Sequence, residues 1–317
     1  MNSPSLRAGR RVFVIRCRVC LFLTLLGLLG PSYKLAAIVG YVNLPMPVGY
    51  TFVANPLDAD GTNSIATVLL PPDGTKVFLW DVTNQVFTVP SVYSAAQNRW
   101  STNYLLPVGR GFVVQSTTNW TNTFIGTVLQ GYLTNAIAGT NRFSLLGAMI
   151  PATAPLSGTN FTFPAIDGAQ VLMFDTPAQS YFDAVIYFNG YAWFDPGGAI
   201  NTNGPVINPA EGFFVNNPGP NTNWVIYFNL GGLSVTSLQA PATQQTSSIS
   251  SGPQIQSLCR TGGMATLQIL NTSQSTYSVQ FSADGLNWKS VATNQTANTC
   301  TAPWPGGTQG YYRLVSP

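Results

Sequence analysis

The sequence contains no histidine, only one glutamate (Glu211) and few charges, since 7% of its 317 residues are Asp, Glu, Lys or Arg. Without histidine, Ser-His-Asp and Cys-His nucleophile systems, His-ligated zinc and histidine acid–base catalysis are excluded. The chain also lacks a G-x-S-x-G elbow and a phosphate-binding glycine-rich loop. Carboxylate chemistry is harder to exclude.

Positive charge is concentrated at the start of the chain. Six of the thirteen Lys and Arg residues precede Ala37, which leaves seven against ten acids and a net charge near −3 for the remainder. Nucleic-acid binding needs clustered cations that neutralise phosphates. We therefore expect no nucleic-acid partner.

Residues 1–37 have the layout of a secretory signal peptide. A basic segment precedes the apolar run RVCLFLTLLGLLG (Arg18–Gly30), and PSYKLAA (Pro31–Ala37) offers small residues for cleavage. The run is too short for a good membrane span. We expect an exported protein, extracellular or on the cell surface, with no membrane span after cleavage. An uncleaved anchor and a periplasmic location are the alternatives, and GRRVFVI (Gly9–Ile15) leaves the route open between Sec and twin-arginine export.

Cysteine is scarce. Cys17 and Cys20 lie in the predicted signal peptide, so Cys259 and Cys300 are the only cysteines of the mature chain. In an oxidising compartment two cysteines predict one disulfide. Such a bond would close a loop of about 40 residues and stabilise the chain by roughly 4 kcal/mol. The alternative is two free buried thiols.

What the sequence does contain is a phrase that occurs twice. PPDGTKVFLWD (Pro71–Asp81) is matched by AIDGAQVLMFD (Ala165–Asp175). Four further matches keep the same order: GYTFVANPL (Gly49–Leu57) with RFSLLGAMI (Arg142–Ile150), Trp100 with Trp193, RGFVV (Arg110–Val114) with EGFFV (Glu211–Val215), and NTFIG (Asn122–Gly126) with NWVIY (Asn223–Tyr227). The chain therefore predicts a duplication of about 90 residues.

The matched blocks predict strands. TKVFLW and AQVLMF are continuous apolar runs, which indicates burial on both faces, as in a sandwich or barrel. We predict an all-β fold of two homologous β-sandwich or barrel-like repeats plus a small C-terminal β-sandwich module. The predicted boundaries are 1–37 for the signal peptide, 38–130 and 131–231 for the repeats, 232–254 for a Ser/Thr/Gln/Pro linker, and 255–317 for the module.

The repeated aspartates have a structural interpretation. Asp73 and Asp167 each precede glycine, where a short acceptor side chain can bond turn N–H groups. Asp81 and Asp175 end a strand and are expected to cap the next turn. We interpret all four as turn residues rather than as catalytic groups.

The loop LDADGTN (Leu57–Asn63) resembles a calcium loop. Asp58, Asp60 and Asn63 supply the hard oxygen ligands that calcium prefers. The spacing departs from the EF-hand pattern, because glycine follows directly after the second Asp and no glutamate comes at the right distance. We expect a polar loop and no cofactor, with calcium as the alternative.

Carboxylates alone suffice for glycoside hydrolysis. Asp183 and Asp195 flank an aromatic hairpin and could face one groove, whereas Glu211 has Arg110 as its counterpart in the other repeat. A charge-reversed position favours a surface site over a shared mechanism. We expect no enzyme, with a glycosidase as the alternative.

The hairpin YFNGYAWF (Tyr187–Phe194) is the best candidate for sugar stacking. Its Asn-Gly turn is a strong hairpin signal. Tyr187, Tyr191 and Trp193 are the candidate rings, although strand alternation places about half of such side chains in a core. The matched positions of Trp100 and Trp193 favour the core for that pair.

The quoted motifs resemble a known pattern. NLPMPVGYTFVANPL, DGTKVFLWD and LPVGRGFVV are similar to a tandem repeat of uncharacterised exported proteins of environmental Gram-negative bacteria. YSVQFSADGLNWKSV and GYYRL resemble the short fibronectin-III-like β-module that often ends such proteins. The resemblance implies this architecture and carries no catalytic residues, because the family has no settled function.

From these observations we expect a non-enzymatic structural protein of an envelope, matrix or appendage. Duplication, low charge and neutral Asn/Thr surfaces suit contacts between copies of the same chain, and sheet edges favour self-association. The alternative is a polysaccharide-binding accessory module that uses exposed aromatic side chains. The expected partners are therefore copies of the chain itself or cell-surface polysaccharide.

Overall fold

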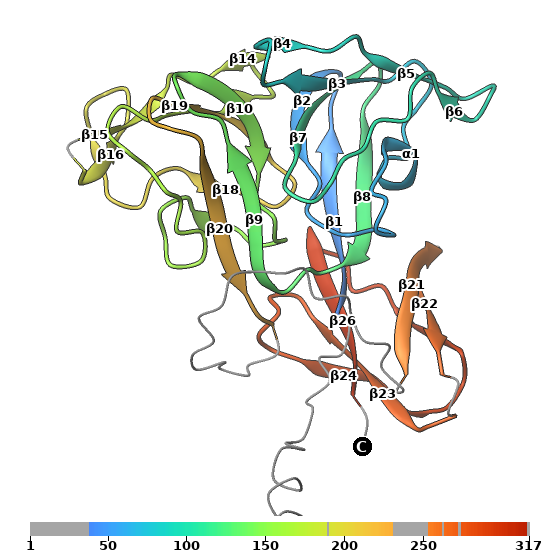
Figure 1. Cartoon of the computed structure of the whole chain (residues 1–317). Helices are drawn as coiled ribbons and strands as arrows, with labels where there is room; N and C mark the ends of the chain where they lie inside the picture. The colour runs from blue at the N-terminus through green and yellow to red at the C-terminus, as the bar shows by residue number, and fades with distance from the viewer. Residues whose placement is uncertain (1–37, 189, 231–252, 262, 272–273, 316–317) are drawn as a thin grey trace, which may run out of the picture. The chain divides into compact units, whose positions relative to one another are not determined.

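The computed structural model describes residues 38–188, 190–230, 253–261, 263–271 and 274–315 (Figure 1). Within these ranges the chain forms strands and one short helix, α1 (Ile65–Val68), so the all-β prediction is confirmed. The predicted signal peptide and the predicted linker up to residue 252 lie outside the described residues. In the described ranges no helix has the length and apolar character needed to cross a bilayer.

The first sheet contains the first copy of the repeated phrase. Its antiparallel strands lie in the order β2, β7, β3, β5 and β6, and β4 pairs with the end of β3. Their bounds are Gly49–Ala54 (β2), Lys76–Asp81 (β3), Val86–Phe87 (β4), Ser91–Ser94 (β5), Arg99–Trp100 (β6) and Gly111–Ser116 (β7). Val77 and Leu79 of β3 enter the core under this sheet, while Phe78 and Trp80 pack against a second cluster on the other face.

The second sheet has the corresponding strand order, β10, β19, β12, β15 and β16, followed by β17. Two short pairs, β11 with β18 and β13 with β14, lie beside it. The bounds are Arg142–Gly147 (β10), Ala154–Pro155 (β11), Gln170–Leu172 (β12), Phe174–Asp175 (β13), Ser180–Tyr181 (β14), Val185–Phe188 (β15), Ala192–Phe194 (β16), Ile200–Asn201 (β17), Val206–Ile207 (β18) and Gly212–Asn217 (β19). Each half therefore builds one antiparallel sheet. β7 and β19 are equivalent in the two sheets, because each lies second in its strand order.

A two-stranded ribbon accompanies each sheet. In the first half, β1 (Val39–Met46) pairs with β8 (Trp120–Thr127). In the second half, β9 (Gly131–Ile137) pairs with β20 (Thr222–Phe228) (Figure 1). One face of each ribbon closes the core of its own half, because Val42 and Phe124 join the first core and Trp224 and Ile226 join the second.

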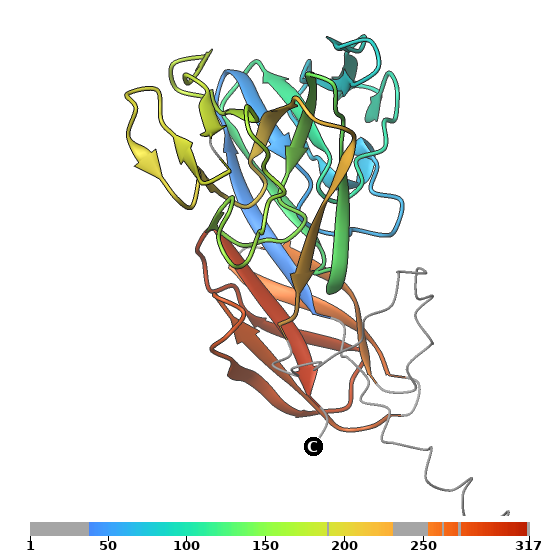
Figure 2. The same ribbon diagram turned by 60° about the vertical axis from the view of Figure 1, so that its left-hand side comes forward.

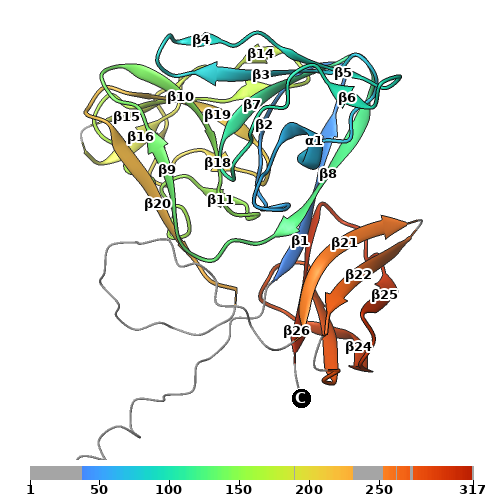
Figure 3. The ribbon, with the colours of Figure 1, turned by 45° about the vertical axis from the view of Figure 1, so that its right-hand side comes forward.

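The C-terminal strands share a sheet with the first ribbon. The sheet order is β24, β23, β26, β1 and β8, in which β26 pairs with β1 from Val39↔Tyr312 to Val42↔Gln309 (Figure 2). Three further strands, β21, β22 and β25, form the facing layer (Figure 3). The bounds are Gln254–Thr261 (β21), Met264–Leu270 (β22), Tyr277–Ser282 (β23), Lys289–Gln295 (β24), Thr299–Pro303 (β25) and Gln309–Val315 (β26). The core between these layers includes Val39 and Tyr41 of β1.

The two large sheets meet where β2 and β7 approach β10 and β19. Ala54 N donates to Ala210 O at 2.9 Å, and Gly147 N donates to Gly109 O at 3.0 Å. The glycines of the RGFVV and EGFFV blocks allow this approach. A Cβ on Gly111 would lie 2.7 Å from the carbonyl carbon of Leu145, and one on Gly212 would lie 2.7 Å from Val53 O. We call this contact the junction.

A cluster of apolar side chains fills the junction. Its buried members are Phe52, Val113, Leu145 and Phe214, and the partly buried residues packed against them are Phe78, Trp80, Phe143, Leu172 and Phe174. Aromatic rings dominate this cluster. Contacts between rings stabilise a fold beyond what the burial of their apolar area contributes. Trp80, for example, meets Phe214 edge to face with ring centroids 4.9 Å apart.

Two glutamines clamp the junction in a matched way. Gln85 Nε2 donates to Phe143 O at 3.1 Å and its Oε1 accepts from Phe143 N at 2.8 Å. Gln179 makes the same two bonds to Tyr50, at 2.9 and 2.6 Å. Each side-chain amide thus pairs with a strand of the other sheet as a neighbouring backbone would. Both glutamines have left-handed backbone, with φ of 56° and 53°. The sequence analysis missed them, although Asp81 to Gln85 and Asp175 to Gln179 share their spacing.

The repeated aspartates bond turn N–H groups. Asp81 Oδ1 accepts from Thr83 N and Asn84 N at 2.8 and 3.0 Å, and Asp175 Oδ1 accepts from Ala178 N at 3.1 Å. Asp73 Oδ1 accepts from Ala95 N at 2.7 Å, in the next hairpin turn. Asp167 Oδ1 accepts from Gly190 N in the same way. Hydrogen bonds from backbone and side chain of Asn84 lower the pKa of Asp81. These hydrogen bonds confirm the interpretation of the four aspartates as turn residues.

One matched block is displaced by a residue. The sequence alignment sets Phe124 against Val225, yet Phe124 is buried and Val225 is exposed. The buried residues of β20 are Trp224 and Ile226. Because side chains alternate between faces along a strand, a shift of one residue exchanges core and surface positions. Pairing Phe124 with Ile226 restores the match.

The predicted disulfide between Cys259 and Cys300 is wrong, because both cysteines are free. Cys259 lies opposite Thr266 and Cys300 opposite Leu267, on the two sides of β22. The two strands are thus separated by a third, about 10 Å, well beyond disulfide reach. Thr266 and Leu267 also point to opposite faces, and accordingly Cys259 is exposed whereas Cys300 is buried.

We predict that the two thiols react very differently. In the native chain from Ile38 to Pro317, Ellman's reagent should label Cys259 quickly and Cys300 slowly, because burial shields Cys300 and raises its pKa. Both should react in guanidinium. We expect one fast-reacting thiol in the unaltered chain and none in Cys259→Ser. A native chain without any reactive thiol before reduction would contradict the prediction.

We also predict that each glutamine clamp stabilises the fold. Gln85→Ala and Gln179→Ala should each lower the free energy of unfolding by about 1–3 kcal/mol, since two hydrogen bonds to a strand are lost. Gln85→Glu keeps the acceptor for Phe143 N and removes the donor for Phe143 O, so its loss should be intermediate at neutral pH. Urea denaturation measures all three. Variants as stable as the unaltered chain would show that water replaces the clamp.

Candidate interaction surface

The aromatic hairpin does not form a sugar-stacking platform. Trp193 is fully buried in the second core and its Nε1 donates to Ser157 Oγ at 2.8 Å. Tyr187 is half-buried and meets the Trp193 ring edge to face at 5.3 Å. Only Tyr191 is exposed, at 66%. The proposed three-ring site is therefore wrong, because β15 and β16 direct two of its rings inward. The expected core position of Trp100 and Trp193 is confirmed.

The predicted calcium ligands already serve the loop that carries them. Asp58 Oδ1 accepts from Gly61 N at 2.7 Å and from Asn63 Nδ2 at 2.8 Å. Asp60 Oδ1 accepts from Thr62 N, Thr62 Oγ1 and Asn63 N, and the Thr62 hydroxyl is the main cause of its lowered pKa. The oxygen of the Asn63 side chain accepts from Ala59 N. A calcium ion would compete with these bonds, and calcium at this loop stays the untested alternative to the expected polar loop.

The three candidate carboxylates lie on separate segments. Asp183 is exposed before β15, and Asp195 begins the turn after β16, where its carbonyl accepts from Gly198 N. Glu211 is half-buried at the junction, where Oε2 accepts from the backbone and side chain of Asn208 at 3.0 and 3.1 Å. Burial raises the pKa of Glu211. Its counterpart Arg110 is also half-buried, and burial lowers its pKa. The charge-reversed position is thus partly exposed at the junction rather than fully exposed.

The first ribbon is covered on its outer face by the C-terminal strands. Tyr41 of β1 is fully buried, its ring lies 4.1 Å from that of Trp304, and its hydroxyl donates to Gly306 O at 2.5 Å. Ile125 of β8, which pairs with Tyr41, packs against the same core. The edge of β1 that faces away from β8 is paired with β26. Both the outer face and this edge are thus occupied within the chain.

The second ribbon presents the same features to solvent. Gly131 and Tyr132 of β9 repeat the Gly-Tyr pair that begins β1, and Tyr132 pairs with Tyr227 as Tyr41 pairs with Ile125. Yet Tyr132 is 64% and Tyr227 46% exposed, with ring centroids 4.9 Å apart. Val225 of the same face is also exposed. Tyr132, Tyr227 and Val225 form an exposed apolar patch that we call the ribbon patch.

The edge of β9 beside the ribbon patch is unpaired among the described strands, because β9 and β20 form a sheet of two strands. The inner face is fixed, since Trp224 is buried and its Nε1 donates to Phe161 O at 2.5 Å. Neither strand contains a charged residue. An open edge with neutral apolar neighbours is a template for pairing with another strand. In the sequence, the repeated Gly-Tyr pair is the signal that could have revealed the open edge of β9.

Comparisons with known proteins identify neither family nor relative. No protein-family model matches the chain, and no curated protein matches it. The resemblance to exported tandem-repeat proteins and to a fibronectin-III-like module therefore stays a prediction. The candidate surface is defined by the exposure and pairing of its own strands.

We predict a pH-dependent effect at Glu211. The pKa of Glu211 is higher in the folded chain than its ordinary value of about 4.5. Protonated Glu211 therefore contributes fully to the stability of the fold below about pH 4.5, and this contribution is lost as the pH rises through the folded-state pKa. Glu211→Gln removes this loss. The melting temperature of the variant should therefore exceed that of the unaltered chain increasingly between about pH 4 and pH 7. Asp183→Asn is the control for charge removal at an exposed site, and an equal pH profile for both variants would contradict the assignment.

Proposed function

We propose that the chain is an exported, non-enzymatic structural protein that associates with copies of itself through β9 and β20. The observation that carries the proposal is the contrast between the two ribbons. The edge and outer face of β1 are covered by β26 and its module, whereas the matching edge and face of β9 are open among the described residues. Export rests on the N-terminal sequence pattern.

The chemistry of the ribbon patch suits contact with a second copy. Strand addition supplies main-chain hydrogen bonds, and burial of Tyr132 and Tyr227 would remove apolar area from water at about 25 cal/mol per Å². The patch carries no charge that a like copy would repel. A twofold arrangement, with β9 antiparallel to β9, is the commonest symmetry of homo-oligomers.

A twofold contact alone ends at a dimer. An extended envelope or matrix needs a second contact, and β24 is a candidate because it is the outermost strand of the five-stranded sheet. Its residues are mostly exposed. The matched strand orders of the two halves support the predicted duplication. A duplication commonly gives one chain two similar surfaces.

Polysaccharide binding by exposed aromatic side chains is the second candidate. Tyr191 on the hairpin and the Tyr132–Tyr227 pair are the exposed rings that favour it. Retention on insoluble polysaccharides distinguishes the two functions, because self-association needs no added ligand.

We predict that Tyr132→Glu disrupts self-association. The unaltered chain from Ile38 to Pro317 should show a mass that rises with concentration in light scattering coupled to size exclusion. Tyr132→Glu places a carboxylate from each copy in the apolar contact, so it should need at least about tenfold more protein to associate. The matched control is Tyr191→Glu, because Tyr191 has nearly the same exposure, 66% against 64%.

The control variant should associate like the unaltered chain. A chain that stays monomeric at every concentration, or two variants with equal behaviour, would remove the ribbon patch as the contact. Loss of polysaccharide retention in both variants with unchanged mass would favour the second candidate.

A further inference from the structure

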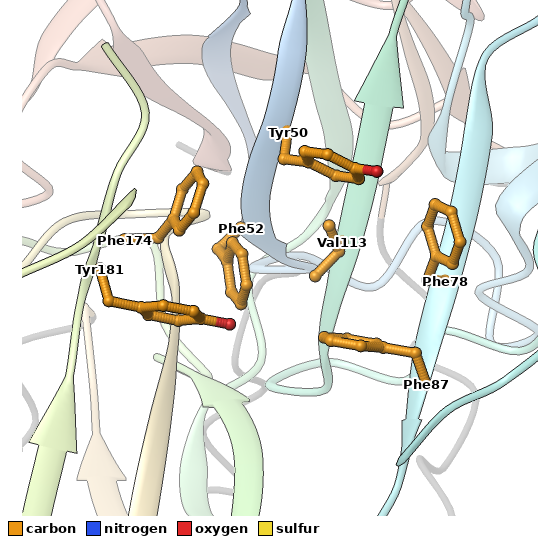
Figure 4. Close-up of a pocket in the computed structure, with 7 residues that line it drawn as sticks. All are labelled: Tyr50, Phe52, Phe78, Phe87, Val113, Phe174 and Tyr181. Carbon is orange, nitrogen blue, oxygen red and sulfur yellow. The ribbon is translucent and has the colours of Figure 1, made fainter. Parts of the chain in front are cut away.

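A pocket of about 300 Å³ opens at the junction, and it shares no residue with the ribbon patch. Its lining residues are Tyr50, Phe52, Phe78, Phe87, Val113, Phe174 and Tyr181. Figure 4 shows six aromatic rings around the small side chain of Val113. Phe174 and Tyr181 come from the second half of the chain and the others from the first. No lining residue is charged.

The register of the two sheets explains why the pocket exists. Val113 of β7 lies between Phe52 of β2 and Phe78 of β3. In the second sheet, Phe214 of β19 lies between Leu145 of β10 and Leu172 of β12. Val113 and Phe214 thus occupy equivalent positions on equivalent central strands. Where one half places a benzyl group, the other places an isopropyl group.

The surroundings of the Phe214 ring show what such a position holds. Its ring centroid lies 4.9 Å from that of Trp80, 6.1 Å from Phe87, 5.9 Å from Phe143 and 6.3 Å from Tyr181. Most of these contacts are edge to face, the arrangement that aromatic quadrupoles favour. A single phenyl ring therefore fills the equivalent site in the second half.

Each of these neighbours has its counterpart in the pocket. Trp80 and Phe87 form a cross-strand pair, as Phe174 and Tyr181 do. Phe143 lies two residues before Leu145, as Tyr50 lies two residues before Phe52. By the same exchange, the Tyr181 contact of Phe214 corresponds to Phe87. These four rings thus map onto Phe174, Tyr181, Tyr50 and Phe87, all of which line the pocket. The fifth ring beside Phe214 is that of Phe52, at 5.8 Å, and its counterpart is the aliphatic Leu145.

We propose that this pocket binds a small uncharged aromatic molecule, whose ring occupies the place that Phe214 fills in the other half. Its volume lies at the lower end of known small-molecule sites. The rings of Phe52 and Phe174 stack at 4.6 Å and form one wall, and Phe78 and Phe87 lie on the opposite side (Figure 4). This inference is independent of the proposed self-association, which uses other strands.

The rim selects for a polar substituent on the ring. Tyr50 and Tyr181 are 41% and 44% exposed, so their hydroxyls remain accessible to water and to a ligand. The hydroxyl of Tyr181 is protonated at neutral pH and can donate a hydrogen bond, and burial raises its pKa further above the ordinary value. A carboxylate or ammonium group has no opposite charge among the lining residues. A neutral phenol is therefore the favoured class.

We predict that the purified chain binds p-cresol with a dissociation constant of about 1 mM or lower. Saturation-transfer NMR and calorimetry measure binding. Val113→Phe supplies the missing ring from the protein itself and should weaken p-cresol at least tenfold, with a melting temperature equal to or above that of the unaltered chain. Val92→Phe, which adds the same group at a 37% exposed position of β5, is the matched control and should bind normally.

The non-aromatic analogue 4-methylcyclohexanol distinguishes a ring-specific site from an apolar hole. At least fivefold weaker binding of the analogue supports the proposal. Equal binding of both compounds, or no binding of p-cresol at 10 mM, overturns it. If Val113→Phe does not fold, Val113→Leu provides an intermediate volume, and unchanged affinity in that variant likewise overturns the proposal.

Discussion

The close approach of two sheets at the junction is the constraint on which the rest of the fold depends. Gly111 and Gly212 must lack side chains, because a Cβ on either would meet the backbone of the other sheet. Backbone bonds from Ala54 and Gly147 then join the halves, and the two glutamine clamps extend the contact on both sides. The aromatic cluster packs into the space that these polar contacts fix. A small number of matched residues thus determines how the cores of both halves are closed.

Matched positions in the two halves differ in how they are filled and in how they are covered. A pocket opens beside Val113, whereas the ring of Phe214 occupies the equivalent position in the second half. Tyr41 and Tyr132 occupy equivalent ribbon positions, yet one is buried by the C-terminal strands and the other is exposed. The two halves have matching strand orders and each has a two-stranded ribbon, and the C-terminal strands pair with the first of these ribbons. Neither surface needs histidine or clustered charge, which the chain lacks.

The sequence predicted the class of fold because strand signals are local: apolar alternation, Asp-Gly turns and aromatic runs. It also predicted the turn roles of Asp81 and Asp175. It failed for the Cys259–Cys300 pair, because strand order and facing depend on long-range pairing with β22. It also placed Trp193 in a binding site although alternation already favoured the core. The glutamine clamps and the ribbon patch follow from contacts between the halves, and their only local signs are a repeated Asp-to-Gln spacing and a repeated Gly-Tyr pair.

The pairing of β1 with β26 joins the first described strand to the last. Because β1 is made first and β26 last, the five-stranded sheet closes only after synthesis has reached β26. Until then Val39 and Tyr41 remain without their cover, and contacts of such long sequence separation form slowly. β1 can pair with β8 as soon as residue 127 has been made, but its other edge stays open until β26 follows.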